Sequence, residues 1–457
     1  MEQITGIHEE IMKRKTIIWI VVGVLSVSCA AWIWSRWTVW FGNPTEEKYI
    51  PSMAPSRILL TFADSIGENR QVSWQCDTVL LASHLEFRDM QETIVKSVTA
   101  KGEVYESPGG KSAYYVACLK GLRSGHHYCY RVCTDDRYSD WFEFSVTTSP
   151  DSSAFLYVGD IQDTIAGIAN QLLKKAFYQH PEAAFLVCGG DLIERPLDCY
   201  WKEMFQSLDS IAQAMPIFTI TGNHDYWKGV VCQLDRRFTL VNSFYQESQV
   251  GENQVFTVRY GNIQFFALDS NREFWYLWQQ REWLKERLAA SSAKWKIVVL
   301  HHPLYSVVRN TNNLIQRWMF NDLVCDAGVD LVLQGHEHAY ARMITDGGTT
   351  PVYIVSHCSP KSYRIEFDEQ FDKFGSGSRY YQKVCTHLDT MFVSAYDAVS
   401  GELYDSLRII KKGNSVEVKD DGTNIPEVIT FYPDPNSRKD RQFAERIQEY
   451  KERKGIK

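Results

Sequence analysis

The chain has 457 residues, 44% of them hydrophobic and 23% charged, which predicts a folded protein with more than one globular unit. The formal net charge of -7 argues against a nucleic-acid partner, because nucleic-acid binding needs a basic face. The 11 cysteines include no CxxC pair, which excludes a zinc knuckle of that kind.

An apolar run begins near the N-terminus, directly after three basic residues at 13–15. Residues 16–36 are long enough to cross a bilayer as a helix, and tryptophans near both ends suit the membrane interface. Because the basic flank is N-terminal, we expect residues 1–15 to be cytoplasmic. We expect a single-pass anchor, with the rest of the chain outside the cytoplasm, periplasmic or extracellular. A cleaved signal peptide and a lipoprotein attached through Cys29 are the alternatives.

Short alternating strands follow a Pro- and Ser-containing linker at residues 37–56. Between residues 57 and 148, apolar and polar positions alternate and turn signals separate the runs, which predicts a β-sandwich. The segment at 121–128 resembles the tyrosine corner of fibronectin type III modules, with Tyr128 supplying the hydroxyl. We therefore expect an all-β, fibronectin III-like domain here.

Residues 151–411 change to apolar strands that alternate with amphipathic helices, which predicts an α/β domain. The remaining residues, 412–457, are polar and charged, and we expect them to form a peripheral tail.

Polar clusters follow five of the predicted strands of this α/β domain. They are Gly159-Asp160-Ile161-Gln162, Gly190-Asp191-Leu192-Ile193-Glu194, Gly222-Asn223-His224-Asp225, His301-His302-Pro303 and Gly335-His336-Glu337-His338. Ligands bind beyond the carboxyl ends of strands in open α/β sheets, so we expect these clusters to converge. Imidazole mixed with carboxylate and amide oxygens indicates transition metals, and a shared aspartate allows two ions to lie about 3.5–4 Å apart.

This series of clusters resembles the calcineurin-like metallophosphoesterase superfamily, whose pattern is GD, GD, GNH[DE], H and GHxH. The residues at 335–342 and at 216–221, together with the preceding β-sandwich, narrow the resemblance to the purple-acid-phosphatase branch. The resemblance implies two β-sheets packed as a sandwich and flanked by helices. It also implies the hydrolysis of phosphate esters.

The resemblance also implies a role for each site residue. It places Asp160 and His338 on a first metal ion, Asp191 between the two ions, and Asn223, His301 and His336 on the second. It implies that His224 contacts the phosphate or protonates the leaving oxygen, and that Asp225 orients the His224 ring. Three further residues are expected around the substrate: His302, Tyr340 and Arg342.

The sequence departs from the purple branch at the first metal ion. Glu194 stands where that branch has an iron-binding tyrosine, and Gln162 stands where the wider superfamily has histidine. Either side chain would supply the missing ligand. Without tyrosinate we expect a colourless protein with two divalent or trivalent ions, chosen from Fe, Mn and Zn.

The function implied is that of an acid-phosphatase-like phosphomonoesterase, in which two metal ions generate the attacking hydroxide. A phosphodiesterase or nucleotidase with the same ions is one alternative, and a non-catalytic surface-binding module is the other. The segment Ser356–Tyr381, with Lys361 and Arg364, is expected to form the pocket wall that decides between monoesters and diesters.

Overall fold

The computed structural model describes residues 2–64, 68–147, 149, 151–242, 250, 254–308, 313–345, 347–413 and 415–456, with side chains from residue 14 onward. The predicted domain boundary at Thr148 lies outside these residues. The chain divides into two compact units, Met1–Thr45 with Trp227–Gln233, and Glu46–Tyr226 with Leu234–Lys457.

Helix α1 (Glu2–Phe41) makes up most of the first unit. Its part Arg14–Phe41 is 28 residues long, with none of its most apolar stretch buried, and by length and composition it is able to cross a membrane. A membrane anchor and a signal sequence share this property. The helix also includes residues 37–41, which the sequence predicts as linker.

Two β-sheets form the N-terminal domain of the second unit. One has the order β1 (Ser56–Phe62), β2 (Arg70–Gln75), β6 (Lys111–Leu119), β5 (Lys101–Glu106). The other has the order β4 (Lys96–Thr99), β3 (Ser83–Asp89), β7 (His126–Thr134), β8 (Arg137–Tyr138), with β9 (Phe142–Val146) also paired to β7. Apolar side chains of both sheets share one core, so the domain is a β-sandwich, and the Tyr128 hydroxyl accepts a hydrogen bond of 2.8 Å from the Arg123 N–H.

Residues 46–53 pack against the globular unit and do not form a free linker. Glu46 is 6% exposed and accepts hydrogen bonds of 2.9 Å from the N–H groups of Gly109 and Asp198. It also forms an ion pair of 2.6 Å with Arg237, which is fully buried. A buried arginine needs such a partner, and this requirement, which the local composition does not reveal, fixes the segment.

Two seven-stranded sheets form the second domain. The first has the order β12 (Ile217–Thr219), β11 (Leu186–Cys188), β10 (Ser152–Val158), β22 (Tyr380–His387), β23 (Thr390–Asp397), β24 (Leu403–Lys412), β25 (Ser415–Asp420). The second has the order β15 (Phe256–Tyr260), β16 (Ile263–Ala267), β17 (Trp295–Val299), β18 (Leu331–Gln334), β20 (Thr349–Val355), β19 (Tyr340–Thr345), β21 (Lys373–Gly375). The strands β10, β11 and β12 are parallel, as are β16, β17, β18 and β20.

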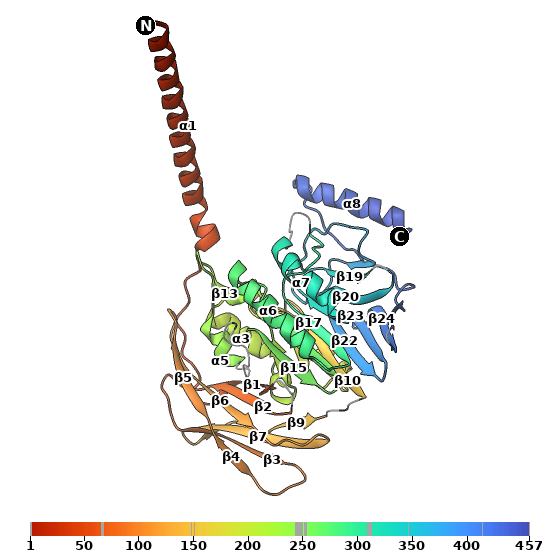
Figure 1. Cartoon of the computed structure of the whole chain (residues 1–457). Coiled ribbons are helices and arrows are strands. Elements are labelled where there is room, and N and C mark those ends of the chain that lie inside the picture. The colour runs from red at the N-terminus through yellow and green to blue at the C-terminus, as the bar shows by residue number, and fades with distance from the viewer. Residues whose placement is uncertain are drawn as a thin grey trace. The chain divides into compact units, whose positions relative to one another are not determined.

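The inner faces of these two sheets pack on each other through an aromatic core that includes Phe155, Phe185 and Phe265. Phe155 and Phe185 stack with ring centroids 5.2 Å apart. Helices cover the outer faces, as the family resemblance implied (Figure 1). On the first sheet they are α2 (Ala169–Gln179), α3 (Asp198–Ser207), α4 (Ile211–Ala214) and α5 (Arg236–Val241), and on the second α6 (Phe274–Ala290), α7 (Leu314–Asp326) and α8 (Arg438–Lys454).

The C-terminal residues differ from the predicted peripheral tail. Strand β25 pairs with β24 at the edge of the first sheet. Helix α8 buries Phe443, Ile447 and Tyr450 against the core on the outer side of the second sheet. These three apolar positions fall on one face of a helix whose other residues are mostly charged, and that composition conceals the packing face. Three short elements complete the fold: η1 (Asn223–Asp225), β13 (Tyr226–Trp227) and β14 (Gln233–Leu234).

Candidate metal centre

The predicted ligands follow the carboxyl ends of five parallel strands. Asp160 comes two residues after β10, Asp191 three residues after β11, and Asn223 four residues after β12. His301 and His336 each come two residues after their strands, β17 and β18. Because parallel strands end at the same edge of a sheet, both sheets deliver donor groups to one place.

Asp160, Asp191 and His338 form a first group of donors. One ligand atom from each lies within 4.8 Å of the others, and all three residues are buried. His338 Nε2 lies 3.5 Å from Asp160 Oδ1. The His336 N–H donates to both carboxylate oxygens of Asp160, at 3.0 and 2.8 Å, and fixes that side chain.

Asn223, His301 and His336 form a second group, which joins the first at Asp191. Asn223 Oδ1 lies 2.8 Å from His336 Nδ1 and 3.2 Å from His301 Nε2. His301 Nε2 is also 3.4 Å from Asp191 Oδ2. Because the Gly189 carbonyl oxygen accepts from His301 Nδ1 at 2.9 Å, Nε2 is the ring nitrogen that faces the other donors. The structure therefore brings together all six residues that the family resemblance places on the metals.

The electrostatics of the two groups favour a cation. Burial and the nearby carboxylate of Asp191 together raise the pKa of Asp160 to about 8. Burial also lowers the pKa of His336 to about 3 and that of His338 to about 2, so both rings are neutral near pH 7. Neutral imidazoles beside crowded carboxylates are the donor set that a transition-metal ion needs.

The backbone at the ligands is strained. Asp160, Asp191, His336 and His338 have φ values of 49°, 54°, 73° and 45°, in the left-handed region that non-glycine residues rarely adopt. A Cβ at Gly335 would collide with the carboxylate of Asp160. The site therefore depends on glycine for the close approach of this carboxylate to the backbone.

One buried polar atom of Gln162 and one of His338 have no hydrogen-bond partner among the described residues. Gln162 donates through Nε2 to Asp191 Oδ2 at 3.1 Å, while its buried Oε1 is unpaired. His338 Nδ1 is buried and unpaired as well. An unpaired buried acceptor costs stability unless something occupies it. The residues present thus fit two metal ions, with Gln162 beside the first.

His224 and Glu194 lie at the mouth of the site. The Glu194 carbonyl oxygen accepts from His224 Nδ1 at 2.7 Å, and the His224 N–H donates to Asp191 Oδ1 at 2.8 Å. Both carboxylate oxygens of Glu194 accept from Lys361 Nζ, at 2.8 and 2.7 Å. Lys361 therefore lies beside Glu194, whereas Arg364 of the same segment pairs with Asp440 of α8.

Asp225 differs from its expected role. It is fully buried and accepts from the N–H groups of Gly222 (2.7 Å), Asp191 (3.1 Å) and Leu192 (3.2 Å). It therefore positions the loop that carries Asp191, while the Glu194 carbonyl orients the His224 ring.

His302 lies at the site, but Tyr340 and Arg342 do not line its rim. The His302 ring lies 4.2 Å from the His336 ring, and its Nδ1 is 3.0 Å from Ser270 Oγ. Tyr340 and Arg342 are each 1% exposed, and both donate to Asp405 at 2.7 Å. Tyr340 and Arg342 are two residues apart on β19, so both side chains point to the same side of the sheet, into the core. The prediction that they shape the rim of the site is therefore wrong.

Two residues that the sequence reasoning missed pack on His338. The Tyr363 ring stacks on it at 4.5 Å, and burial raises the pKa of Tyr363 to about 12. The ring of His357 lies 5.5 Å from it on the chain that follows β20. The strand-end rule that found the other ligands would have found His357, whereas nothing local marks Tyr363.

Comparison with known proteins agrees with this geometry. Residues 154–340 match the family described as "Calcineurin-like phosphoesterase". The chain thus contains a phosphoesterase domain of the calcineurin-like class. Residues 55–146 match the "Purple acid Phosphatase, N-terminal domain". The chain therefore carries a purple-acid-phosphatase N-terminal domain followed by a calcineurin-like metallophosphoesterase domain, as the resemblance in the sequence predicted.

Individual relatives are distant. "Probable inactive purple acid phosphatase 9" of Arabidopsis thaliana is 19% identical over 454 residues, 81% of this chain and 69% of the relative. "Purple acid phosphatase 4" of the same plant is 28% identical over 212 residues, 41% of this chain and 61% of the relative. The solved "Structure of PhoD" matches with a TM-score of 0.59 and 12% identity, over 88% of this chain and 98% of that one. These matches support a phosphoric-ester hydrolase, and PhoD shares the fold.

Proposed function

We propose that this protein hydrolyses phosphate monoesters with two metal ions bound by the residues described above. One observation carries the proposal: Asp191 lies in both donor groups, within 4.8 Å of Asp160 and His338 and 3.4 Å from His301. A shared carboxylate is the arrangement that allows two ions to lie side by side. When bound, the ions supply positive charge for the phosphoryl oxygens and acidify water.

The residues around the first ion support Gln162 as its remaining ligand. Both carboxylate oxygens of Glu194 are occupied by Lys361, whereas Gln162 Oε1 is buried and unpaired. An amide oxygen is a weak, neutral ligand, so this site favours Mn, Zn or Fe(II) over Fe(III). The purified protein is then colourless, and a visible absorption band that Tyr363→Phe removes would contradict this ligand set.

His224 is the proposed general acid. The Glu194 carbonyl accepts from its Nδ1, which leaves Nε2 as the atom that gives a proton to the leaving oxygen. A positioned acid of this kind contributes about 10²–10⁴-fold to the rate. Lys361, 36% exposed in its side chain, stands beside Glu194 as a cation for the phosphate group. A bound phosphate would compete with the Glu194 carboxylate for this ammonium group, and a doubly charged monoester competes more strongly than a singly charged diester.

Metal content and turnover test this proposal together. The full chain should carry two equivalents of Fe, Mn or Zn and hydrolyse an aryl phosphate faster than a bis-aryl phosphate. Asp191→Asn should reduce kcat/KM by about 10²–10³-fold, the cost of removing one preorganised charge partner. Asp209→Asn, whose side chain is 67% exposed, is the matched control and should retain full activity.

Other outcomes would point to other functions. A faster reaction with the bis-aryl phosphate would indicate a phosphodiesterase or nucleotidase at the same site. Metal binding without turnover of any ester would indicate a non-catalytic binding module, a possibility that the name of one relative, "Probable inactive purple acid phosphatase 9", raises. Full activity in Asp191→Asn would refute the two-metal proposal.

We also propose that α1 anchors the protein in a membrane, with the metal site outside the cytoplasm. The exposed apolar stretch Arg14–Phe41 and the basic residues before it support this orientation. The β-sandwich is proposed to be fibronectin III-like, supported by the bond from the Arg123 N–H to the Tyr128 hydroxyl. Membrane extraction at alkaline pH and protease access in sealed cells would test the anchor, because a cleaved signal peptide would leave a soluble chain.

A further inference from the structure

Six large apolar side chains lie exposed on two neighbouring helices of the globular unit. This aromatic face consists of Phe274, Trp275 and Trp278 on α6 and Leu314, Ile315 and Trp318 on α7. Their exposed fractions are 49%, 60%, 45%, 63%, 51% and 62%. Trp318 links the two helices, because its ring stacks on Phe274 at 6.0 Å and lies 6.3 Å from Trp278.

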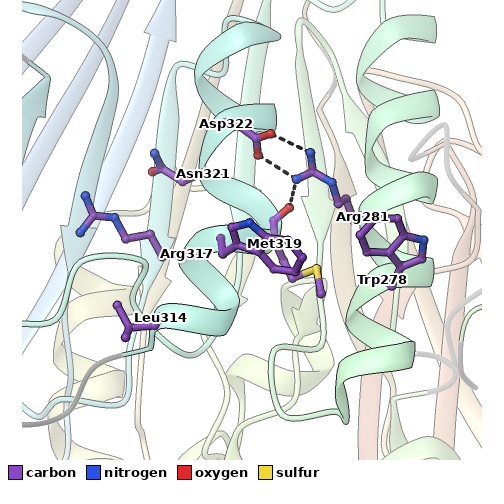
Figure 2. Close-up of a pocket in the computed structure, with 8 residues that line it drawn as sticks. Trp278, Arg281, Leu314, Arg317, Met319, Asn321 and Asp322 are labelled. Atoms are coloured by element: carbon purple, nitrogen blue, oxygen red, sulfur yellow. Dashed lines mark hydrogen bonds and ion pairs between the residues drawn. The ribbon is translucent and has the colours of Figure 1, made fainter.

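The aromatic face borders a shallow hollow between the helices. Figure 2 shows Trp278 and Arg281 of α6 on one side of it and Leu314 and Arg317 of α7 on the other. Arg281 pairs with Asp322 at 2.6 Å, so this end of the hollow carries no net charge. Contiguous exposed apolar surface of this kind marks an interaction site in a soluble domain.

The composition of the face favours a lipid surface over a protein partner. Among the described residues outside α1, the three most exposed tryptophans all belong to it. Indole rings concentrate at the interface between bilayer and water, where an apolar ring and a polar N–H are both accommodated. Arg317, which stacks on Tyr305 at 4.0 Å, adds a cation beside the face, and cations favour anionic headgroups.

The chain also limits how far the globular unit extends from the proposed anchor. Helix α1 ends at Phe41, and Glu46 is already fixed in the globular unit by its ion pair with Arg237 at 2.6 Å. Only residues 42–45 connect the two, and they span at most about 18 Å even when fully extended. A domain held this close to a bilayer exposes part of its surface to the headgroup layer.

We propose that the aromatic face docks on the surface of the lipid bilayer. This inference rests on the proposed anchoring by α1. The face adjoins the metal site, because Gln316 of α7 donates to the Ser270 carbonyl at 3.0 Å and Ser270 Oγ lies 3.0 Å from His302 Nδ1. Docking therefore fixes how the site is presented to phosphate esters at the membrane surface.

Photolabelling in nanodiscs tests the proposal. The full chain is placed in nanodiscs of phosphatidylcholine and phosphatidylglycerol that contain a lipid with a diazirine near its headgroup, and adducts are mapped by mass spectrometry. We expect adducts within Arg14–Phe41 and on Phe274, Trp278, Leu314 and Ile315. The variant Trp275→Ser/Trp318→Ser removes two indoles, each equivalent to about tenfold or more in the docking equilibrium. Labelling at the four unchanged positions should therefore fall at least fivefold, which is less than the full loss expected for two indoles.

The control variant removes exposed aromatics elsewhere. Tyr178→Ser/Tyr432→Ser, at positions 68% and 88% exposed, should leave the labelling of α6 and α7 unchanged. Adducts in Arg14–Phe41 but none on α6 or α7 would overturn docking while the anchor stands. Absence of adducts in both would overturn the anchor and docking together. Cross-links from α6 or α7 to a second copy would assign the face to self-association and also overturn docking on lipid.

Discussion

Substituting Asp225 tests whether the site is positioned by its backbone as well as by its ligands. This fully buried carboxylate receives three N–H groups, from Gly222 at 2.7 Å, Asp191 at 3.1 Å and Leu192 at 3.2 Å. Burial raises the pKa of Asp225, but every donor points at an oxygen lone pair, so the geometry accommodates the carboxylate. Asp225→Asn keeps the size of the side chain and replaces one acceptor oxygen with a donor.

The size of the effect follows from these contacts. With its oxygen toward Gly222 and Asp191, the asparagine would turn its NH₂ group toward the Leu192 N–H and lose that bond. One charge-assisted hydrogen bond is worth about 1.5–3 kcal/mol, and making the other two neutral costs about 1 kcal/mol each. The local structure is thus destabilised by about 3.5–5 kcal/mol. Because Asp191 moves with this loop, we expect metal affinity to fall about 10–100-fold, as for other partners that orient ligands.

Calorimetric titration of the metal-depleted protein measures this affinity directly. Asp89→Asn is the matched control, because Asp89 is also a buried carboxylate that accepts a backbone N–H, from Gln91 at 3.0 Å, but it lies in the β-sandwich. It should lower the melting temperature and leave metal affinity unchanged. If Asp225→Asn bound metal as tightly as the wild type, the three N–H contacts would not position Asp191, and the reasoning would be refuted.

Three further substitutions give distinct results. Lys361→Met should raise KM for an aryl phosphate about tenfold, the loss of about 1.4 kcal/mol of charge interaction, and leave kcat within about twofold; an unchanged KM would exclude Lys361 from phosphate binding. Gly335→Ala should abolish binding of the first metal ion, measured by elemental analysis, because the new Cβ collides with the Asp160 carboxylate. Two retained ions would contradict the close approach of this carboxylate to the backbone at Gly335. Glu337 has a pKa raised by burial to about 7, above its ordinary 4.5, so its contribution to stability is complete below pH 4.5 and is lost as pH rises through about 7. Thermal melts without metal should therefore show that the free energy of unfolding of the wild type falls by about 3 kcal/mol between pH 4.5 and about 7, and that Glu337→Gln lacks this fall. The same pH dependence in both proteins would contradict this assignment to Glu337.

The sequence predicts the ligands because each one obeys a local rule. Asp160, Asp191 and His336 each follow a glycine at the end of an apolar strand, and strand ends can be recognised from neighbouring residues alone. Tyr340 and Arg342 follow the same cluster, yet their buried positions depend on Asp405, 65 and 63 residues further along the chain. A partner so distant in sequence leaves no local signal, so the prediction of a rim position was wrong.

The same limit explains the segment before the β-sandwich and the residues on His338. Glu46 lies in a segment whose composition is typical of a linker. It is nevertheless buried, because Arg237, 191 residues away, needs a counter-charge. Tyr363 reaches His338 across a loop and offers no strand-end signal. In both cases the determining contact is tertiary, and periodicity and turn chemistry carry no information about it.

The strained ligands and the buried charges of the site have one physical explanation. Four ligands adopt left-handed φ values, and burial together with Asp191 raises the pKa of Asp160, so the folded chain maintains an arrangement that costs free energy on its own. A cation repays part of that cost by binding the carboxylates and the neutral rings of His336 and His338. If stability were the only requirement, the strand ends that carry these ligands would have no reason to keep strained backbone and crowded charges. The retention of strain, crowded carboxylates and an unpaired Gln162 oxygen at one place therefore supports selection for metal-dependent chemistry there.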